Sequence, residues 1–523
     1  MISFSLILKR RIIIILLAIC VVIGLFIFRD YGFTWDEPLD YRYADALGYA
    51  YNPANWLSGH FDLNKSYGPM PNYHKNRGPA YFLLAREPVY LIEILRVHTD
   101  DAWHLVNFLT FLLGVYFLYK ICERFMQFWA AFAISALFLF QPSLWGHAFI
   151  NPTDSPFLVF LTGSVYLGFC MVDQLAESKG QPALKTFLQI LLPAIFVGIA
   201  TSIRVLGPLA GIFVGIYFLT RQPTRQTFLW MALYAAISIL VMLATWPYLW
   251  EGPFGFIEAF QFMANNSIDS PLVLFAGQVY NVSALPRSYL PFYLLFTLTE
   301  PVWPLFALGL VTAYLKLKND FQKLTQALLI LIWFMIPLGY TVLLNPANYD
   351  GMRHFLFILP PIFIFAGFAF DWLFEKIHRT WINSLLVVAL LTPGIYGIIQ
   401  LHPYEYTYYN SFIGGTGGVF RRYETDYWLT CYKEAIEEFN QLETQRVTLV
   451  IHEVPGAAVP YVASNVKILV EGPQSSRIRP GDFVLINTRT NEDMHDFHGA
   501  PILLTVGRAG ATFCVIKKVT SIP

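Results

Sequence analysis

The stretch FTWDEPLDYRYADAL (residues 33–47) places two adjacent carboxylates, Asp36 and Glu37, shortly after an apolar segment with a basic flank. The apolar segment, Ile12 to Phe28, carries no charged side chain. At ~1.5 Å per residue it extends roughly 25 Å, near the lower limit for a helix that crosses a bilayer. Residues 9–11 before it are Lys-Arg-Arg, no small-residue cleavage site follows, and ten further apolar segments come after it. We therefore expect a retained first membrane span rather than a cleaved signal peptide.

The composition excludes a soluble globular protein. Of the 523 residues, 56% are hydrophobic, 17% aromatic and only 13% charged, which leaves too little polar surface for a soluble chain of this length. The 35 basic and 35 acidic residues cancel, so no overall field favours nucleic acid as a partner. The sequence predicts an integral membrane protein without a nucleic-acid partner.

The apolar segments predict the number of membrane crossings. Each segment is as long as a membrane span or slightly shorter. Together they predict a polytopic α-helical membrane protein with about eleven transmembrane helices. Besides the first, the segments are approximately Trp103–Tyr119, Phe128–Trp145, Pro156–Val172, Phe187–Thr201, Leu206–Leu219, Phe228–Trp246, Val302–Leu315, Ala327–Leu344, Phe355–Phe370 and Trp381–Ile399.

The placement of basic residues predicts the orientation. Short loops on one side are rich in Lys and Arg, whereas the opposite short loops carry only Arg204, Arg287 and Arg353. Because basic loops face the cytoplasm, we expect a cytoplasmic N-terminus, with the long loop 29–101 and the C-terminal part outside. The basic side carries Lys120, Arg124, Lys179, Lys185, Arg221, Arg225, Lys316, Lys318, Lys323, Lys376 and Arg379.

The tail, residues 402–523, differs from the transmembrane part, residues 1–401. A helix-like stretch at 432–442 precedes five β-rich runs, RVTLVIHEV, VKILV, DFVLINT, PILLTV and ATFCVIKKV, with Gly, Pro and Asn between them. We expect a small extracytoplasmic α/β domain. Cys431 and Cys514 form either a disulfide or two buried thiols, and the spacing of the five cysteines matches no zinc or redox motif.

Ionisable residues gather at the outer ends of the predicted spans. A charge at such a position is often only a helix-end anchor, but several of them arriving from separate loops indicate a shared site. Acidic and basic groups around one outer cavity suit a reaction that needs a general base and a clamp for an anionic leaving group. The residues are Asp36, Glu37, His147, Asp154, Arg204, Glu300, Arg353 and His354.

The same segments carry a family resemblance that covers nearly the whole chain. The stretch at 33–47 resembles the first-loop acidic motif of polytopic lipid-linked-sugar glycosyltransferases with the GT-C fold, a superfamily that includes protein O-mannosyltransferases and aminoarabinose transferases (family 39-like). Four further segments are similar in order and sidedness: HAFINPTDSPFLVFLTGSVYLG (147–168), GIATSIRVLGPLAG (198–211), RHFLFILPPIFIFAG (353–367) and HPYEYTYYNSFIGGTGGVFRRYETDYW (402–428).

The resemblance implies transfer of a sugar from a polyprenyl-phosphate donor to an acceptor on the extracytoplasmic face, by a single inverting displacement. It implies Asp36 as the base, with Glu37 second. An acceptor hydroxyl needs a carboxylate to take its proton, and a phosphate leaving group needs its charge matched. Arg353 is the first candidate for the donor phosphate, then Arg204, then Lys75 and Arg77. The family's His-Pro-Pro or Lys-Pro element is absent there, since this chain has His-Lys at 74–75 and Arg-Gly-Pro at 77–79.

Asp154, His147 and His354 are candidates for orienting the acceptor or a metal ion. Asp154 precedes a helical span, so helix capping is the competing interpretation, and satisfied interfacial histidines are the commoner case. No cofactor is firmly predicted, and a divalent cation is left open. The expected partners are the donor, membrane lipid, and a glycan, lipid or protein acceptor. The tail favours a bacterial plasma membrane.

Two alternatives stay open. A transporter or flippase would also have many spans and outer charges, although transporters place their polar sites near the bilayer midplane in broken helices. A non-catalytic membrane assembly subunit with a receptor-like outer domain is the second, but it gives the adjacent Asp36 and Glu37 no role.

Residues 287–299, apolar up to Glu300, predict a short separate helix near the outer leaflet, with an extension of the next span as the competing interpretation.

Overall fold

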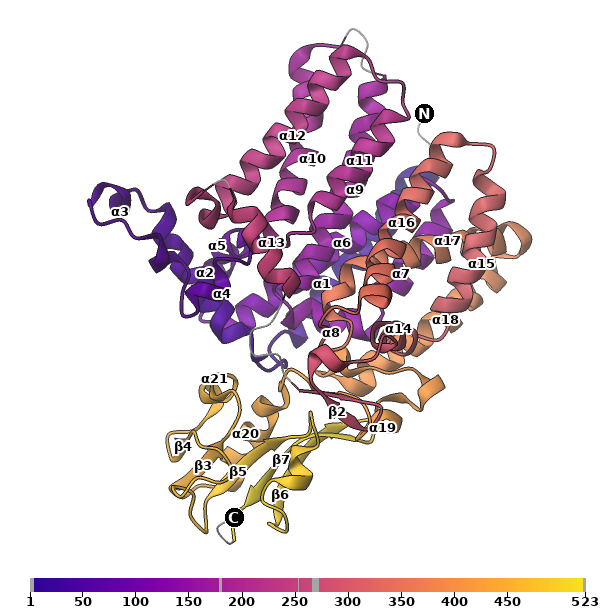
Figure 1. Cartoon of the computed structure of the whole chain (residues 1–523). Helices are drawn as coiled ribbons and strands as arrows, with labels where there is room; N and C mark the ends of the chain where they lie inside the picture. Colours follow the sequence, from indigo (N-terminus) through magenta and orange to yellow (C-terminus); the bar gives the residue numbers. More distant parts are fainter. Residues whose placement is uncertain (1–3, 178–180, 253, 266–271, 521–523) are drawn as a thin grey trace.

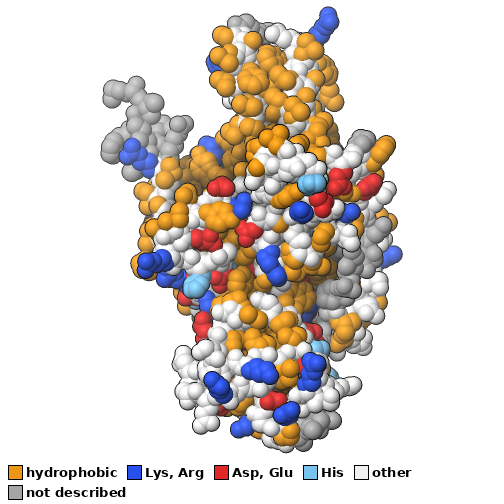
Figure 2. Space-filling view, turned by 90° about the vertical axis from the view of Figure 1, so that its left-hand side faces the viewer, with side chains coloured by type: hydrophobic (Ala, Val, Ile, Leu, Met, Phe, Trp, Pro, Cys, Tyr) orange, Lys and Arg blue, Asp and Glu red, His pale blue; other side chains and the backbone are white. Residues whose placement is uncertain are grey.

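The computed structural model describes residues 4–177, 181–252, 254–265 and 272–520. Long helices make up one end of the molecule and a C-terminal sheet makes up the other (Figure 1). In the space-filling view, hydrophobic side chains cover the upper, helical part, whereas charged side chains gather at mid-height and on the C-terminal part (Figure 2). A membrane-embedded part is therefore distinct from a water-exposed one.

Every predicted apolar segment lies on a helix or a helix pair. Among the described residues, seven helices are long and apolar enough to cross a membrane, and one bent pair brings the number to eight. The chain is an integral, multi-pass membrane protein; the number eleven stays a prediction, because the remaining three apolar helical segments are shorter. The seven are α6 (Thr99–Cys122), α9 (Asp154–Ala176), α10 (Ala183–Ile203), α12 (Arg225–Thr245), α16 (Phe321–Leu344), α17 (Leu359–Lys376, preceded by η4, Arg353–Ile358) and α18 (Thr380–Leu401); the shorter three are the Arg11–Ile27 part of α1 (Phe4–Ile27), α11 (Pro208–Leu219) and α15 (Val302–Leu317).

The helices divide into a packed interior and a peripheral set. In α9 and the η4–α17 segment, 83% and 89% of the most apolar window is buried within the protein, compared with 6% in α12 and 11% in α18. Because α12 and α18 are as apolar as the buried helices, their exposed faces are suited to contact lipid.

The segment Phe128–Trp145, predicted as one span, is a bent pair. Helix α7 (Phe128–Leu139) meets α8 (Pro142–Ile150) at 63°. The residue before a proline is driven out of the helical region, and Gln141, before Pro142, has φ −76° and ψ 118°. All of α8 is buried, and it packs on α6.

The long loop 29–101 is a folded layer rather than an open loop. Helix α5 packs on α6 and α10, and α2 packs on α5. Its elements are α2 (Glu37–Tyr51), α3 (Pro53–Leu57), η1 (Leu63–Ser66), α4 (Pro71–His74) and α5 (Ala80–Glu93).

Residues 246–301 contain the predicted short helix. Helix α14 (Tyr289–Phe296) is separated from α15 by residues 297–301 and buries Tyr289 and Tyr293, so it is not an extension of the next span. The other elements are η2 (Pro247–Trp250), α13 (Gly255–Asn265), the hairpin β1 (Val273–Phe275) and β2 (Gln278–Tyr280), and η3 (Val282–Ala284).

The C-terminal sheet contains all five predicted strands, in the order β4-β3-β5-β7-β6. Strands β4, β3 and β5 are parallel to one another. Strand β7 runs antiparallel to β5, and β6 runs antiparallel to β7. Cys431 and Cys514 lie in its core as free thiols, so they form no disulfide. The elements are α20 (Cys431–Leu442), β3 (Val447–Ile451), α21 (Pro455–Ala458), η7 (Val459–Tyr461), β4 (Val466–Leu469), β5 (Phe483–Asn487), α22 (Glu492–His495), β6 (Ile502–Arg508) and β7 (Ala511–Lys518).

Residues 402–430 join the two parts. Tyr406, Tyr427 and Trp428 pack in the core of the helical part, whereas Leu429 and Cys431 begin the core of the sheet. A one-residue step thus passes from one hydrophobic core to the next, which holds the sheet close against the ends of the helices. The segment contains η5 (Glu405–Thr407), η6 (Ser411–Ile413) and α19 (Gly415–Val419).

Candidate active site

Asp36 and Arg353 form an ion pair where the first loop meets the start of η4. Arg353 Nη1 donates to Asp36 Oδ2 at 2.7 Å. The Arg353 side chain is 5% exposed and that of Asp36 is 30% exposed, so only the carboxylate is open to solvent. The guanidinium is 4.9 Å from the centre of the Trp428 ring and 5.2 Å from that of Tyr349, which fixes its orientation.

Glu37 faces away from this pair. Its carboxylate accepts the Thr34 N–H at 2.7 Å, while Thr34 Oγ1 accepts the Glu37 N–H. It also accepts the hydroxyl of Tyr41 and lies 3.1 Å from His104 Nε2, with no exposed surface. A carboxylate with every face occupied cannot reach an acceptor. The structure therefore assigns Glu37 to holding the start of α2, which leaves the Asp36 side chain without a capping bond and free to face Arg353.

Asp350 holds the other side of Arg353. Its carboxylate lies 3.0 Å from Arg353 Nη2 and accepts from Arg489 Nη2 at 2.8 Å. Asp350 has φ +56° and is followed by Gly351 at φ +65°. Asp and Gly are the residue types that adopt this left-handed conformation most readily, and the turn points the carboxylate inward. Burial raises the pKa of Asp350, against the lowering effect of the two arginine charges.

Arg489 comes from the C-terminal sheet and was not predicted as a site residue. It lies just after β5, is 4% exposed, and donates to Glu424 as well as to Asp350. Its guanidinium is 4.3 Å from the centre of the Trp35 ring, next to Asp36 in the chain. Burial raises the pKa of Glu424 to about 7, although Arg489 opposes this shift. Nothing local in the sequence marks Arg489, because its partners lie 139 and 65 residues away.

A second ion pair lies on the same side of α2. Arg77 Nη1 is 3.6 Å from Asp40 Oδ1, and its guanidinium is 4.8 Å from the centre of the Tyr73 ring. A Cβ atom at Gly78 would lie 2.0 Å from the carbonyl oxygen of Ser202. Only glycine therefore lets the first loop approach the end of α10 so closely.

The third ion pair, Arg204 with Asp154, lies at that end of α10. Asp154 does not cap α9; Asn151 Oδ1 instead accepts the Asp154 N–H at 2.8 Å, so the Asp154 carboxylate is free to bind Arg204. The competing interpretation, in which Asp154 only caps the helix, is therefore wrong. Burial raises the pKa of Asp40 to about 7, and the charges of Arg77 and Arg204 both oppose this shift, so the pairs act on one another.

The structure does not bring Lys75 to this group. Its ammonium lies 5.4 Å from the centre of the Tyr248 ring, and its carbonyl oxygen accepts from Trp246 Nε1. Of these two residues, only Arg77 lies within ion-pair distance of a carboxylate of α2.

The two candidate histidines occupy different places. His147 is buried, with Nδ1 3.3 Å from Asn151 Nδ2 and Nε2 3.1 Å from the Tyr427 hydroxyl, so both ring nitrogens have partners. His354 packs edge-on against Tyr349 at 4.9 Å and lies close enough to Asp154 for their charges to interact. Both histidines lie close enough to Asp154 and Arg353 for their charges to interact.

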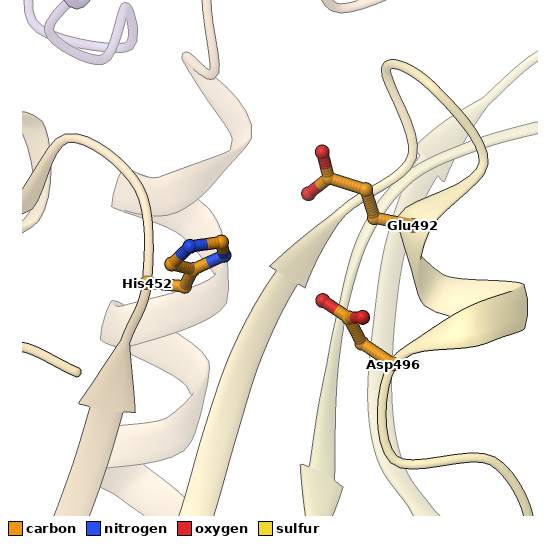
Figure 3. A group of neighbouring side chains, drawn as sticks. All are labelled: His452, Glu492 and Asp496. Atoms are coloured by element: carbon orange, nitrogen blue, oxygen red, sulfur yellow. The ribbon is translucent and has the colours of Figure 1, made fainter. Parts of the chain in front are cut away.

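Metal-ligating atoms do not converge around Asp154, which is bound to Arg204. Within the described ranges, one group of His, Cys, Asp and Glu side chains brings three ligand atoms together. It consists of His452, Glu492 and Asp496 in the C-terminal sheet (Figure 3), and none of these was predicted as a site residue.

Known proteins of similar fold were found by structure and not by sequence. No family model matches the chain, and no curated protein matches it. ArnT from Cupriavidus metallidurans in the apo state is 13% identical, with 96% of this chain and 97% of ArnT covered and a TM-score of 0.50. The oligosaccharyltransferase of Archaeoglobus fulgidus, solved with a tethered acceptor peptide, is 10% identical over 96% of this chain and 74% of its own, also with a TM-score of 0.50. The chain has the GT-C fold. The fold expected from the resemblance is confirmed.

On this GT-C fold, three arginines and a half-exposed carboxylate converge from four separate segments. Asp36 stands at the start of α2, Arg77 after α4, Arg204 at the end of α10 and Arg353 at the start of η4. Guanidinium groups bind phosphate oxygens through paired hydrogen bonds, and a carboxylate accepts a proton from a hydroxyl. The arrangement can bind a phosphate group and activate a nucleophile next to it.

Proposed function

We propose that this chain is an integral membrane glycosyltransferase that moves a sugar from a polyprenyl-phosphate donor to an acceptor on the extracytoplasmic face. The observation that carries the proposal is the contact between Asp36 and Arg353. A base and a phosphate-binding cation meet there, and only the base is open to solvent. The GT-C fold, which ArnT and an oligosaccharyltransferase share, supports the same class of reaction.

In the proposed reaction, Asp36 accepts the proton of the acceptor hydroxyl as its oxygen attacks the anomeric carbon. The bond from that carbon to the phosphate oxygen breaks on the opposite side, so the anomeric configuration inverts. Arg353, Arg204 and Arg77 match the charge of the departing polyprenyl phosphate, which needs no proton from the enzyme. Glu37 acts only as a positioning residue.

The present pairing of Arg353 gives a reason for ordered binding. The guanidinium is shared between two carboxylates, and its buried Nε has no hydrogen-bond partner among the described residues. A donor phosphate has several oxygens and could accept from Nε as well as from Nη1, which the Asp36 carboxylate does not do. We infer that donor binding draws Arg353 from Asp36, which leaves the carboxylate free to take a proton only when a sugar is in place.

The remaining parts of the proposal concern placement and partners. Asp154 holds Arg204 through their ion pair, and His354, close to Asp154, would contact the acceptor. His147 hydrogen-bonds to the Tyr427 hydroxyl and supports the position of that ring. Lys75 is not among the proposed phosphate ligands. We propose a bacterial plasma-membrane location, with the N-terminus cytoplasmic and the sheet outside, and a glycan, lipid or protein as acceptor.

The test is release of free polyprenyl phosphate by the purified protein from a panel of radiolabelled polyprenyl-phosphate sugars. A sugar that supports release identifies the donor, and no release from any member with a range of acceptors contradicts the proposal. Undecaprenyl phosphate alone serves as a binding probe. Arg353→Gln should weaken its binding at least tenfold because a charge-assisted pair contributes about 1.5–3 kcal/mol. Arg446→Gln, at an exposed position in the sheet, is the matched control and should bind as the unmodified protein does.

A further inference from the structure

Polar residues follow three neighbouring parallel strands of the C-terminal sheet. His452 and Glu453 come directly after β3, Glu471 comes after β4, and Asn487 ends β5. Because β3 is parallel to both β4 and β5, these residues meet at one edge of the sheet. They line a pocket together with Glu492 and Asp496. The carboxyl ends of parallel strands are where open α/β sheets bind ligands.

Three side chains face one another across this pocket. His452 points from the end of β3 toward Glu492 and Asp496, which lie at the start of α22 and directly after it (Figure 3). One ligand atom from each lies within 4.8 Å of the others. Zn²⁺ bonds of about 2.0–2.2 Å place ligand atoms roughly 3–3.5 Å apart. Side-chain shifts of at most about 1–2 Å therefore bring the three ligand atoms to coordination distance.

Glu471 at the pocket's edge is paired with Arg477, at 2.7 Å, whereas the other three carboxylates of the pocket form no ion pair among the described residues. In the described part of the chain, no Lys or Arg nitrogen lies within 4.0 Å of a carboxylate oxygen of Glu453, Glu492 or Asp496. Lys517, which lies nearby, donates to the main-chain carbonyl oxygens of Asp493 and Asp496, at 2.6 and 2.9 Å. The carboxylates of Glu453, Glu492 and Asp496 are therefore close to basic residues but not directly bound to one.

A second group of contacts orients these carboxylates. Asn487 is buried, and its Nδ2 donates to Glu453 Oε2 at 2.8 Å and to Glu492 Oε2 at 3.4 Å. The Thr490 hydroxyl donates to the other oxygen of Glu492 at 3.0 Å. Residues that hydrogen-bond to carboxylate ligands and fix their direction are typical of the surroundings of a metal ion.

We propose that His452, Glu492 and Asp496 bind a divalent transition-metal ion, Zn²⁺ in the first place, through one imidazole nitrogen and two carboxylate oxygens. Mixed nitrogen and oxygen ligands favour such an ion over Mg²⁺ or Ca²⁺, which prefer oxygen alone. The ion would join the end of β3 to the segment 487–497. Because this segment also contains Arg489, which binds Asp350, the ion would help to hold Arg489 in position. The inference is independent of the proposed glycosyl transfer.

The test uses the full-length protein purified in detergent and treated with a chelator, which is then removed. Equilibrium dialysis against Zn²⁺ with metal analysis should give saturable binding of one ion per chain. His452→Ala, and separately the pair Glu492→Gln with Asp496→Asn, should weaken binding at least tenfold. His498→Ala, at an exposed position outside the group, is the matched control and should bind as the unmodified protein does.

Thermal unfolding provides a readout that shows whether each variant is folded. In chelator, His452→Ala should unfold at the same temperature as the unmodified protein, because the exposed ring makes no bond that the fold needs. Added Zn²⁺ should raise the unfolding temperature of the unmodified protein and of His498→Ala but not of His452→Ala. Absence of saturable Zn²⁺ binding, or binding that His452→Ala leaves unchanged, would overturn the proposal. Saturation by Mg²⁺ in preference to Zn²⁺ would overturn it as well.

Discussion

Replacing Asp36 should reduce sugar transfer, whereas replacing its neighbour Glu37 should mainly reduce the stability of the fold. Asp36→Asn keeps the shape of the side chain but removes its ability to accept a proton. A positioned general base contributes about 10²–10⁴-fold, which corresponds to roughly 3–5 kcal/mol of transition-state stabilisation. Transfer should fall by that factor. Arg353 keeps Asp350 at 3.0 Å, and the Asp36 side chain is 30% exposed, so the free energy of unfolding should change by about 1 kcal/mol or less.

Glu37→Gln is the matched comparison at the next position. Its carboxylate accepts from Thr34 N–H and the Tyr41 hydroxyl and contacts His104, with no exposure to solvent. An amide has a single acceptor oxygen, so one buried donor is left unsatisfied. The cost is about 1–3 kcal/mol for the lost bond. We therefore expect Glu37→Gln to unfold at a lower temperature and to retain more transfer than Asp36→Asn.

The assay combines release of free polyprenyl phosphate with thermal unfolding of the same preparation. The expected result is a folded, inactive Asp36→Asn and a less stable, partly active Glu37→Gln. Turnover of Asp36→Asn within about threefold of the unmodified protein would remove Asp36 from the role of base, since a positioned base contributes at least about 10²-fold. A Glu37→Gln variant that is fully stable but inactive would refute the division of roles between the two residues.

Three further predictions concern charges outside this pair. Arg489→Ala leaves two buried carboxylates facing each other, so it should lower the unfolding temperature and reduce transfer, whereas Arg479→Ala, at an exposed position, should do neither. Arg204→Ala should raise the KM for the donor about tenfold or more and change kcat less, because a charge-assisted pair with phosphate contributes about 1.5–3 kcal/mol; an unchanged KM would contradict its role. Burial favours neutral His402, but its two carboxylate partners outweigh this and raise the pKa of His402 to about 9. The two ion pairs of protonated His402 stabilise the folded protein by about 1–2 kcal/mol at this partial exposure. This stabilisation is complete below pH 6.5 and is lost as the pH passes 9. The unfolding temperature should therefore fall between about pH 7 and 9.5 in the unmodified protein but not in His402→Gln.

The positions of helices and strands along the chain could be predicted from the sequence where they depend on neighbouring residues. Every apolar segment predicted from hydropathy is helical, and all five strands of the tail lie where alternation and turn residues placed them. The break at Pro142 was not predicted, although its cause is local, because hydropathy is continuous across it. The free thiols of Cys431 and Cys514 could not be decided from spacing, which is compatible with either state.

The candidate site was readable in part. The sequence identified Asp36, Arg204 and Arg353 as members of one group, and the structure brings them together. The family resemblance ranked Asp36 before Glu37, but the sequence did not show that Glu37 is fully buried, because neighbouring carboxylates differ only in which way the start of α2 turns them. Nor did it identify Arg489, which reaches Asp350 only once the sheet has docked on the helices.

The amino-acid sequence by itself determined that this is a multi-pass membrane protein with a β-rich tail, and where its helices and strands lie. These features follow from hydropathy and periodicity, which act over a few residues. Only the tertiary structure decided which charges are paired, which carboxylate is open, and that His452 meets Glu492 and Asp496. Coulomb interactions depend on distance and burial in space, and residues hundreds of positions apart acquire both only when the chain has packed.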